Sequence, residues 1–118
     1  MLAAVLAIAL SHHEGCRTVA CERRVHRAEL AATRARWARV VRPFNAKLER
    51  MARCESGGVW SIANGNGFFG GLQFDARTWR SVGGRGLPHW HTRLEQKYRA
   101  VLLIQRRGFQ PWPVCGRA

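Results

Sequence analysis

The sequence predicts an α+β fold that is mostly helical and carries one short β-hairpin wing. Two observations predict the helices: long stretches lack Gly and Pro, and apolar residues recur at helical spacing. A third observation, two Asn-Gly pairs within an aromatic segment, predicts the hairpin. The length of 118 residues allows one modest hydrophobic core, and a hydrophobic fraction of 47% argues against a disordered chain.

The first 42 residues are expected to form a basic arm. Residues 2–10 are an apolar run, too short to span a bilayer, that suits either the apolar part of a signal peptide or the start of a helix. Residues 17–41 contain no Gly or Pro and are rich in Arg and Ala, so they predict a helix. Its sparse apolar positions favour a solvated or loosely packed helix over a dedicated nucleic-acid-binding one. We therefore expect an arm, residues 1–42, and a domain, residues 43–118.

The domain is expected to open with a helix that begins at Pro43 and ends at Gly57-Gly58. Four of its residues are separated by four, three and four positions, which places them on one stripe. They are Phe44, Leu48, Met51 and Glu55. A carboxylate in the last turn, in line with the apolar face, is unusual for a surface glutamate. Glu55 is therefore a candidate functional residue.

The rest of the domain is expected to combine the wing with two further helices. Residues 59–74, with Asn64-Gly65 and Asn66-Gly67, predict the hairpin. Asp75 is placed to cap a short helix over residues 76–82. Thr92 and Glu95 form a capping box for a helix that reaches about Arg107.

The last helix should bury one apolar face and end at Gly108. That face is expected to comprise Leu94, Tyr98, Val101, Leu102 and Gln105. Residues 109–118 are expected to be extended and anchored by Trp112 and Cys115.

The charge balance predicts a polyanionic partner. Twenty Lys and Arg residues against seven Asp and Glu residues give a formal net charge of +13. Such a charge suits nucleic acid, an anionic membrane or an acidic cell-wall polymer, and does not choose among them. The sequence has no helix-turn-helix signature, no RNP aromatic pattern and no zinc-finger spacing, so specific nucleic-acid binding is the weaker alternative.

The four cysteines, at positions 16, 21, 54 and 115, allow three disulfide pairings. An even number in a short chain favours an oxidising, extracytoplasmic destination. A zinc site could be imagined from His12, His13, Glu14, Cys16, Cys21 and His26. Their spacing matches no closed four-ligand pattern, so we expect no metal and no cofactor.

Four blocks of residues, in order between positions 43 and 116, carry a family resemblance. They are Cys54-Glu55-Ser56-Gly57-Gly58-Val59-Trp60, Gly65-Asn66-Gly67-Phe68-Phe69-Gly70-Gly71-Leu72-Gln73-Phe74, Thr78-Trp79 with Gly83-Gly84, and Trp112-Pro113-Val114-Cys115-Gly116. Together they resemble the catalytic domain of the resuscitation-promoting factors, transglycosylase-like and lysozyme-related muralytic enzymes of actinobacteria and their phages. The resemblance implies a lysozyme-like fold that cleaves the β-1,4 bond between N-acetylmuramic acid and N-acetylglucosamine in peptidoglycan.

The resemblance also implies roles for particular residues. Glu55 matches the family's catalytic glutamate, and Asp75 and Thr78 match its substrate-contacting pair. The family's disulfide maps onto Cys54–Cys115, which leaves Cys16 and Cys21 free to form a local disulfide.

The chain departs from the family pattern at two places where a change is expected to alter saccharide contacts without removing the acid. Ala63-Asn64 stands where the family often has Asn-Thr. Arg107 stands where a glutamine usually precedes the Gly-aromatic pair.

Residue chemistry agrees with a role in glycosidic cleavage. A general acid must stay protonated near neutrality, which apolar neighbours such as Met51, Trp60 and the Phe68-Phe69 pair would favour for Glu55. Several other side chains are candidates for binding sugar. Trp60, Phe68 and Phe69 would stack on sugar faces, and Asn66 and Gln73 would bind N-acetyl groups.

Asp75 is either a second carboxylate of the reaction or only a helix cap. If it is only a cap, the nucleophile is the 6-hydroxyl of muramic acid or the N-acetyl group, and the sequence does not choose between hydrolysis and a 1,6-anhydro product. The main alternative function is a non-catalytic cationic wall-binding module. We expect a monomer without a transmembrane span, bound to glycan strands and anionic wall polymers, either secreted or encoded by a phage and delivered to the wall.

Overall fold

The computed structural model describes residues 15–118, so the apolar run at residues 2–10 and His12, His13 and Glu14 lie outside the described residues. The chain divides into two compact units, Met1–Arg36 and Trp37–Ala118, and each is considered by itself. Among residues 15–118, no helix has the length and apolarity needed to cross a bilayer.

The helix expected over residues 17–41 of the arm is formed. Helix α2 spans Val19–Val41, and the Thr18 hydroxyl accepts a hydrogen bond from the Cys21 backbone N–H at 3.2 Å, which caps its first turn. A disulfide joins Cys16 to Cys21, so neither thiolate is free for a metal. Most arginines of α2 are exposed, and Val41 is its buried residue.

Helix α3 carries the stripe that the sequence predicted. A 3₁₀ turn, η1 (Arg42–Phe44), leads into α3 (Asn45–Ser56). Leu48 and Met51 are fully buried, and Phe44 packs against the core that they join. Gly57 adopts a φ of 66°, a left-handed conformation that ends the helix directly after Ser56. Glu55 therefore lies in the last turn of a helix whose position the core fixes.

Helix α5 (Arg93–Arg107) is capped as expected, because the Thr92 hydroxyl accepts from the Glu95 backbone N–H at 3.1 Å. Its expected buried face is partly wrong. Val101 is buried, but Gln105 is exposed and Leu94, Tyr98 and Leu102 are only partly buried. The fully buried positions are Gln96, Lys97, Ala100, Val101 and Leu103.

Two polar residues of α5, Gln96 and Lys97, are buried, and other elements supply their hydrogen-bond partners. The ammonium group of Lys97 donates to Asn45 Oδ1 at 2.7 Å and to Glu49 Oε1, which joins α5 to α3. This hydrogen bond from Lys97 holds the pKa of the Glu49 carboxyl below its ordinary value.

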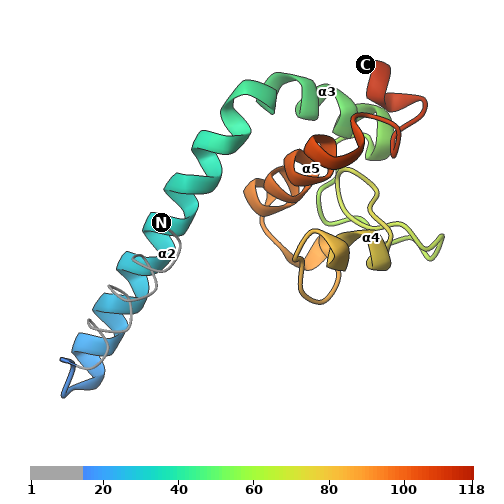
Figure 1. The fold of residues 1–118 in the computed structure, drawn as a ribbon. Coiled ribbons are helices and arrows are strands. Elements are labelled where there is room, and N and C mark those ends of the chain that lie inside the picture. The colour runs from blue at the N-terminus through green and yellow to red at the C-terminus, as the bar shows by residue number, and fades with distance from the viewer. Residues whose placement is uncertain (1–14) are drawn as a thin grey trace. The chain divides into compact units, whose positions relative to one another are not determined.

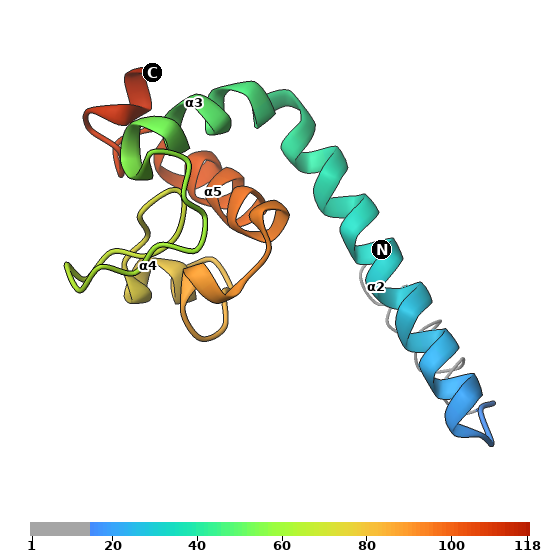
Figure 2. The same ribbon diagram turned by 180° about the vertical axis from the view of Figure 1, so that it is seen from behind.

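The core lies where α3, α5 and the aromatic residues of the loops meet. In both views α5 runs between α3 on one side and the loops with α4 (Ala76–Ser81) on the other (Figure 1 and Figure 2). Trp79, Leu72, Phe74 and Trp112 fill the space between them. A 3₁₀ turn, η2 (Pro88–Trp90), precedes α5.

The expected β-hairpin is not formed. Within residues 59–74 the chain makes two isolated bridges, Ala63 with Phe69 and Phe69 with Phe74, and the described residues contain no strand. The physical reason is the run of positive-φ residues: Gly65, Gly67, Gly70 and Gln73 interrupt the extended backbone before a ladder can continue. The fold is therefore mostly helical, with loops where the wing was expected.

The C-terminal segment is also not extended. The backbone N–H groups of Trp112, Gly116 and Arg117 donate to carbonyls three or four residues earlier, and η3 covers Cys115–Arg117. Three prolines or glycines within residues 111–116 favour such successive turns over a strand. Trp112 and Cys115 are both buried, as expected of anchors.

Candidate active site

Glu55 borders a cavity of about 380 Å³ at the end of α3. Its side chain is half-buried, and within residues 15–118 its carboxylate has neither a hydrogen-bond partner nor an ion-pair partner. The rest of the lining comes from the loop after α3 and from the C-terminal segment. The lining residues other than Glu55 are Asn66, Phe68, Gln73, Pro111, Trp112, Pro113, Val114 and Cys115.

Burial raises the pKa of the Glu55 carboxyl above its ordinary value of 4.5, because the ionised form loses water that no charge or donor from residues 15–118 replaces. Its position in the last turn of α3 acts in the same direction, since the carbonyl end of a helix disfavours a negative charge. The site therefore favours a protonated carboxyl group that faces a cavity. This is the state that a general acid needs.

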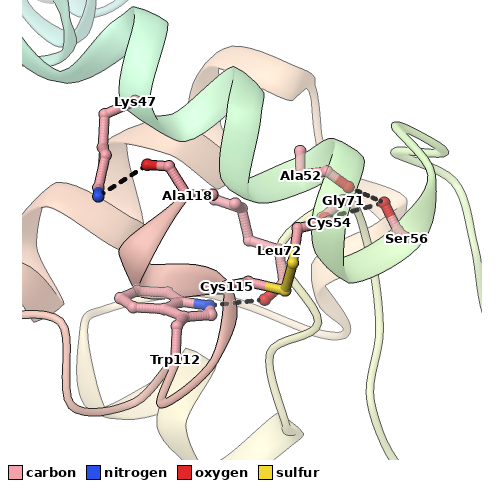
Figure 3. The surroundings of a disulfide bond; sticks show 9 residues. All are labelled: Lys47, Ala52, Cys54, Ser56, Gly71, Leu72, Trp112, Cys115 and Ala118. Atoms are coloured by element: carbon pink, nitrogen blue, oxygen red, sulfur yellow. Dashed lines mark hydrogen bonds between the residues drawn. A yellow bond between two sulfur atoms is a disulfide. The ribbon is translucent and has the colours of Figure 1, made fainter.

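The two neighbours of Glu55 attach the end of α3 to two different walls. Cys54 forms a disulfide with Cys115, which belongs to the C-terminal wall of the cavity (Figure 3). The Ser56 hydroxyl lies 2.9 Å from the Gly71 carbonyl oxygen and 3.0 Å from that of Ala52, so it connects α3 to the loop that precedes Gln73 (Figure 3). The Cys-Glu-Ser sequence thus holds the carboxyl between its walls.

A second cavity, of about 220 Å³, adjoins the first. Its lining includes Asp75, Thr78 and Arg107. The two cavities share Phe68, Gln73, Pro111 and Trp112. We call the combined hollow the groove; Glu55 lies at one end and Asp75, Thr78 and Arg107 lie at the other.

Asp75 is the N-cap of α4. One carboxylate oxygen accepts from the Thr78 backbone N–H at 2.7 Å, and the other accepts from the Thr78 hydroxyl at 2.9 Å. Each oxygen therefore accepts one hydrogen bond from Thr78, which holds the carboxylate against the first turn of α4.

Gln73 and Trp112 form the shared part of the groove. Gln73 has a φ of 53°, an uncommon conformation for a residue with a side chain, and its amide donates to the Gly70 carbonyl at 3.0 Å. The Trp112 indole N–H donates to the Leu72 carbonyl at 2.9 Å, which fixes the residue before Gln73 (Figure 3). The backbone at Gln73 is thus held on both sides, which orients its side chain toward the groove lining.

Gln96 holds the same loop from the side of α5. Its amide oxygen accepts from the Gly71 N–H at 3.0 Å, and its amide nitrogen donates to the carbonyls of Trp60 and His91. A Cβ atom at Gly71 would lie 2.4 Å from the Trp60 ring, so only glycine allows this approach. Sequence patterns did not reveal Gln96, because a glutamine on a helix gives no signal of burial.

The structure brings some of the predicted sugar-binding residues together and places others elsewhere. Asn66, Phe68, Gln73, Asp75 and Thr78 line the groove with Glu55. Trp60 and Phe69 are absent from the lining of both cavities.

Trp60 and Phe69 instead pack on other parts of the domain. Trp60 packs beneath Arg93 and Lys97, whose charged groups lie 5.3 and 5.5 Å from its ring. Phe69 stacks on His89 with ring centroids 5.3 Å apart. Phe68, which is 46% exposed, is the aromatic residue of that segment available to a ligand.

These features define a class: a small, mostly helical, disulfide-closed domain with an open groove, whose acidic residue Glu55 has no partner in the part of the chain that the structure describes. The chain belongs to the transglycosylase-like domain family, whose sequence model matches residues 43–115.

Proteins similar to this chain are resuscitation-promoting factors. It is 46% identical over 69 residues to resuscitation-promoting factor Rpf of Micrococcus luteus, which covers 58% of this chain and 31% of that protein. It is 46% identical over 74 residues to RpfE of Mycobacterium tuberculosis, which covers 63% and 43% respectively. A match to RpfB of Mycolicibacterium smegmatis is 47% identical over 70 residues. The matched segment is less than half the length of each of these relatives.

Proposed function

We propose that the chain cleaves the β-1,4 bond between N-acetylmuramic acid and N-acetylglucosamine in peptidoglycan, with Glu55 as the general acid. One observation carries the proposal: a half-buried carboxyl with a raised pKa and no protein partner among the described residues borders the groove. Family membership supports the same reaction, because it is described as transglycosylase-like. Asn66, Phe68, Gln73 and Thr78 are proposed to bind the sugars.

The nucleophile is proposed to come from the substrate. Glu55 and Asp75 are the carboxylates that line the groove, and both oxygens of Asp75 already accept hydrogen bonds from Thr78. Glu55 gives its proton to the leaving O4 atom as the C1–O4 bond breaks. The 6-hydroxyl of the muramic acid then attacks C1 and returns a proton to Glu55, which yields a 1,6-anhydro product and regenerates the acid.

The net charge of +13 is proposed to hold the protein on anionic wall polymers. Helix α2 supports this role, because Arg23, Arg27 and Arg34 are exposed and lie on one stripe. The disulfides Cys16–Cys21 and Cys54–Cys115 support an extracytoplasmic location.

The test compares peptidoglycan cleavage by the wild type and by Glu55→Gln. The substitution keeps the size of the side chain and removes its titratable proton, so cleavage should fall by a factor of about 100 or more. Zymography measures the loss, and mass spectrometry of the released muropeptides identifies the cleaved bond and the anhydro end. Glu22→Gln, which changes an exposed carboxylate of α2, is the matched control.

Three outcomes would contradict the proposal or part of it. Cleavage by Glu55→Gln at the wild-type rate would exclude Glu55 as the acid. Wall binding without cleavage by the wild type would instead indicate the non-catalytic wall-binding module. Products with ordinary reducing ends would leave the proposed cleavage intact but show that water, and not the 6-hydroxyl of muramic acid, is the nucleophile.

A further inference from the structure

Arg107 places a positive charge at the end of the groove away from Glu55. It is the last residue of α5, it is exposed, and it borders the cavity that Asp75 and Thr78 also line. Among the described residues that line the two cavities of the groove, Arg107 is the one basic side chain. A ligand in the groove therefore meets a single guanidinium group.

That guanidinium group has no partner within residues 15–118, whereas its neighbour does. Arg106 donates from Nη1 to the Ser81 carbonyl at 2.7 Å, which fixes it against the end of α4. Arg107 makes no hydrogen bond or ion pair with any described residue. Its donors are therefore available to a ligand.

Within residues 15–118, neither acidic residue of the groove forms an ion pair with Arg107. The carboxylate of Asp75 is directed to the backbone and hydroxyl of Thr78. Glu55 borders the other cavity of the groove and, in its proton-donating form, carries no charge. The guanidinium group of Arg107, rather than the whole cavity, is thus the group that can bind an anion, because the Asp75 carboxylate in the same lining is hydrogen-bonded to Thr78.

Resting on the proposed function, we infer that Arg107 makes this end of the groove selective for a sugar that carries a free carboxylate. In peptidoglycan this group is the lactyl carboxylate of a muramic acid whose stem peptide has been removed. An intact stem peptide converts the same carboxyl into a neutral amide, and N-acetylglucosamine has no such group. A guanidinium group binds the two oxygens of a carboxylate through two parallel hydrogen bonds. An amide has only one acceptor oxygen and no charge, so it cannot form this pair.

The inference is tested by equilibrium binding, which does not require turnover. The probe is a tetrasaccharide of alternating N-acetylglucosamine and N-acetylmuramic acid with free lactyl carboxylates, compared with the same tetrasaccharide converted to its methyl amide. The full chain with Glu55→Gln should bind the free acid about tenfold more tightly than the amide. Adding Arg107→Gln should remove this preference, and adding Arg107→Lys should restore part of it.

Arg80→Gln is the matched control, because Arg80 is an exposed arginine of α4 that lies outside the lining of both cavities. It removes the same charge and should leave the preference intact. Equal binding of acid and amide in the Glu55→Gln background, or an equal loss in Arg80→Gln, would overturn the inference. Failure of the proposed function is a separate result, because it appears as absence of cleavage by the wild type whatever the binding preference.

Discussion

Glu55 becomes a candidate acid through its immediate neighbours more than through its own position on α3. Cys54 and Ser56 attach the same helix end to the C-terminal wall and to the Gly71 loop. The carboxyl between them borders a cavity and receives no donor from any described residue that would stabilise its ionised form. Its raised pKa has one dominant cause, loss of water, and this makes its pH dependence simple to predict.

Stability should decrease with rising pH because of Glu55. Below its ordinary pKa of 4.5 the carboxyl is neutral in the folded and unfolded chains, so it imposes no cost. As the pH rises through the raised pKa of the folded state, the buried ionised carboxylate lowers the free energy of unfolding. Glu55→Gln should therefore match the wild type at about pH 3 and exceed it at about pH 7 in denaturant unfolding.

The cleavage rate should follow the same ionisation. Only the protonated carboxyl donates to the leaving group, so the rate should fall as the pH rises through a value above 4.5. For the stability prediction, a difference in the free energy of unfolding between Glu55→Gln and the wild type that is constant with pH, or that has the opposite sign, would show that Glu55 is not desolvated in the folded protein.

Sequence reasoning at this scale succeeded where a residue type has a local signature. The spacing of Phe44, Leu48 and Met51 placed Glu55 in line with a buried face, and α3 has that face. The sequence also predicted a role for Trp60 in sugar binding, because tryptophan stacks on sugars. The structure instead packs Trp60 against the backbone of Gly71, a contact between distant parts of the chain that no local pattern encodes.

At the scale of helices and loops, local sequence signals predict where an element ends but not which of its faces is buried. Caps and turn glycines predicted the ends of α4 and α5, because those signals act within one turn. The buried face of α5 was misjudged because burial of Gln96 and Lys97 depends on acceptors and donors from α3 and the loops. The hairpin was misjudged because frequent positive-φ residues make turns without leaving room for strands.

The loop over residues 70–73 should be sensitive to small substitutions at Gly71. Gly71→Ala adds a Cβ atom 2.4 Å from the Trp60 ring, which must shift within a packed core. We expect the free energy of unfolding to fall by about 2 kcal/mol, and cleavage to weaken because Gln73 is displaced. Thermal or denaturant unfolding measures the first effect, and zymography measures the second.

Two further variants separate this clash from a general effect of alanine. Gly67→Ala should cost only the left-handed backbone strain of about 1 kcal/mol, because no neighbour lies within 4 Å of its Cβ position. Trp60→Leu combined with Gly71→Ala should be less destabilising than the sum of the single changes. Strict additivity would show that the ring is not what Gly71 accommodates.

At the scale of the molecule, the Cys54–Cys115 disulfide closes most of the domain. Its sequence separation of 61 residues predicts a contribution of about 4 kcal/mol in the loop-entropy account. Replacing both cysteines with alanine should lower the stability of the unit Trp37–Ala118 by about that amount and reduce cleavage. Denaturant unfolding of the full chain, followed by tryptophan fluorescence, gives the measurement.

The second disulfide supplies the control. Cys16 and Cys21 are five residues apart in the other unit, so their replacement should leave the unfolding of Trp37–Ala118 and the cleavage rate unchanged. Equal losses from both double variants would mean that the stabilisation does not arise from closing the domain.

The Cys54–Cys115 disulfide beside Glu55 makes the completed site depend on the redox conditions around the protein. Glutathione and thioredoxin keep such sulfur atoms reduced in the cytosol of most cells. In a reduced chain, the Trp112–Leu72 hydrogen bond would still hold the C-terminal segment, but the covalent link beside Glu55 would be missing. Oxidation would add the covalent link between Glu55's helix and the C-terminal wall, so on the proposed function the site would be complete only in a compartment where disulfides form.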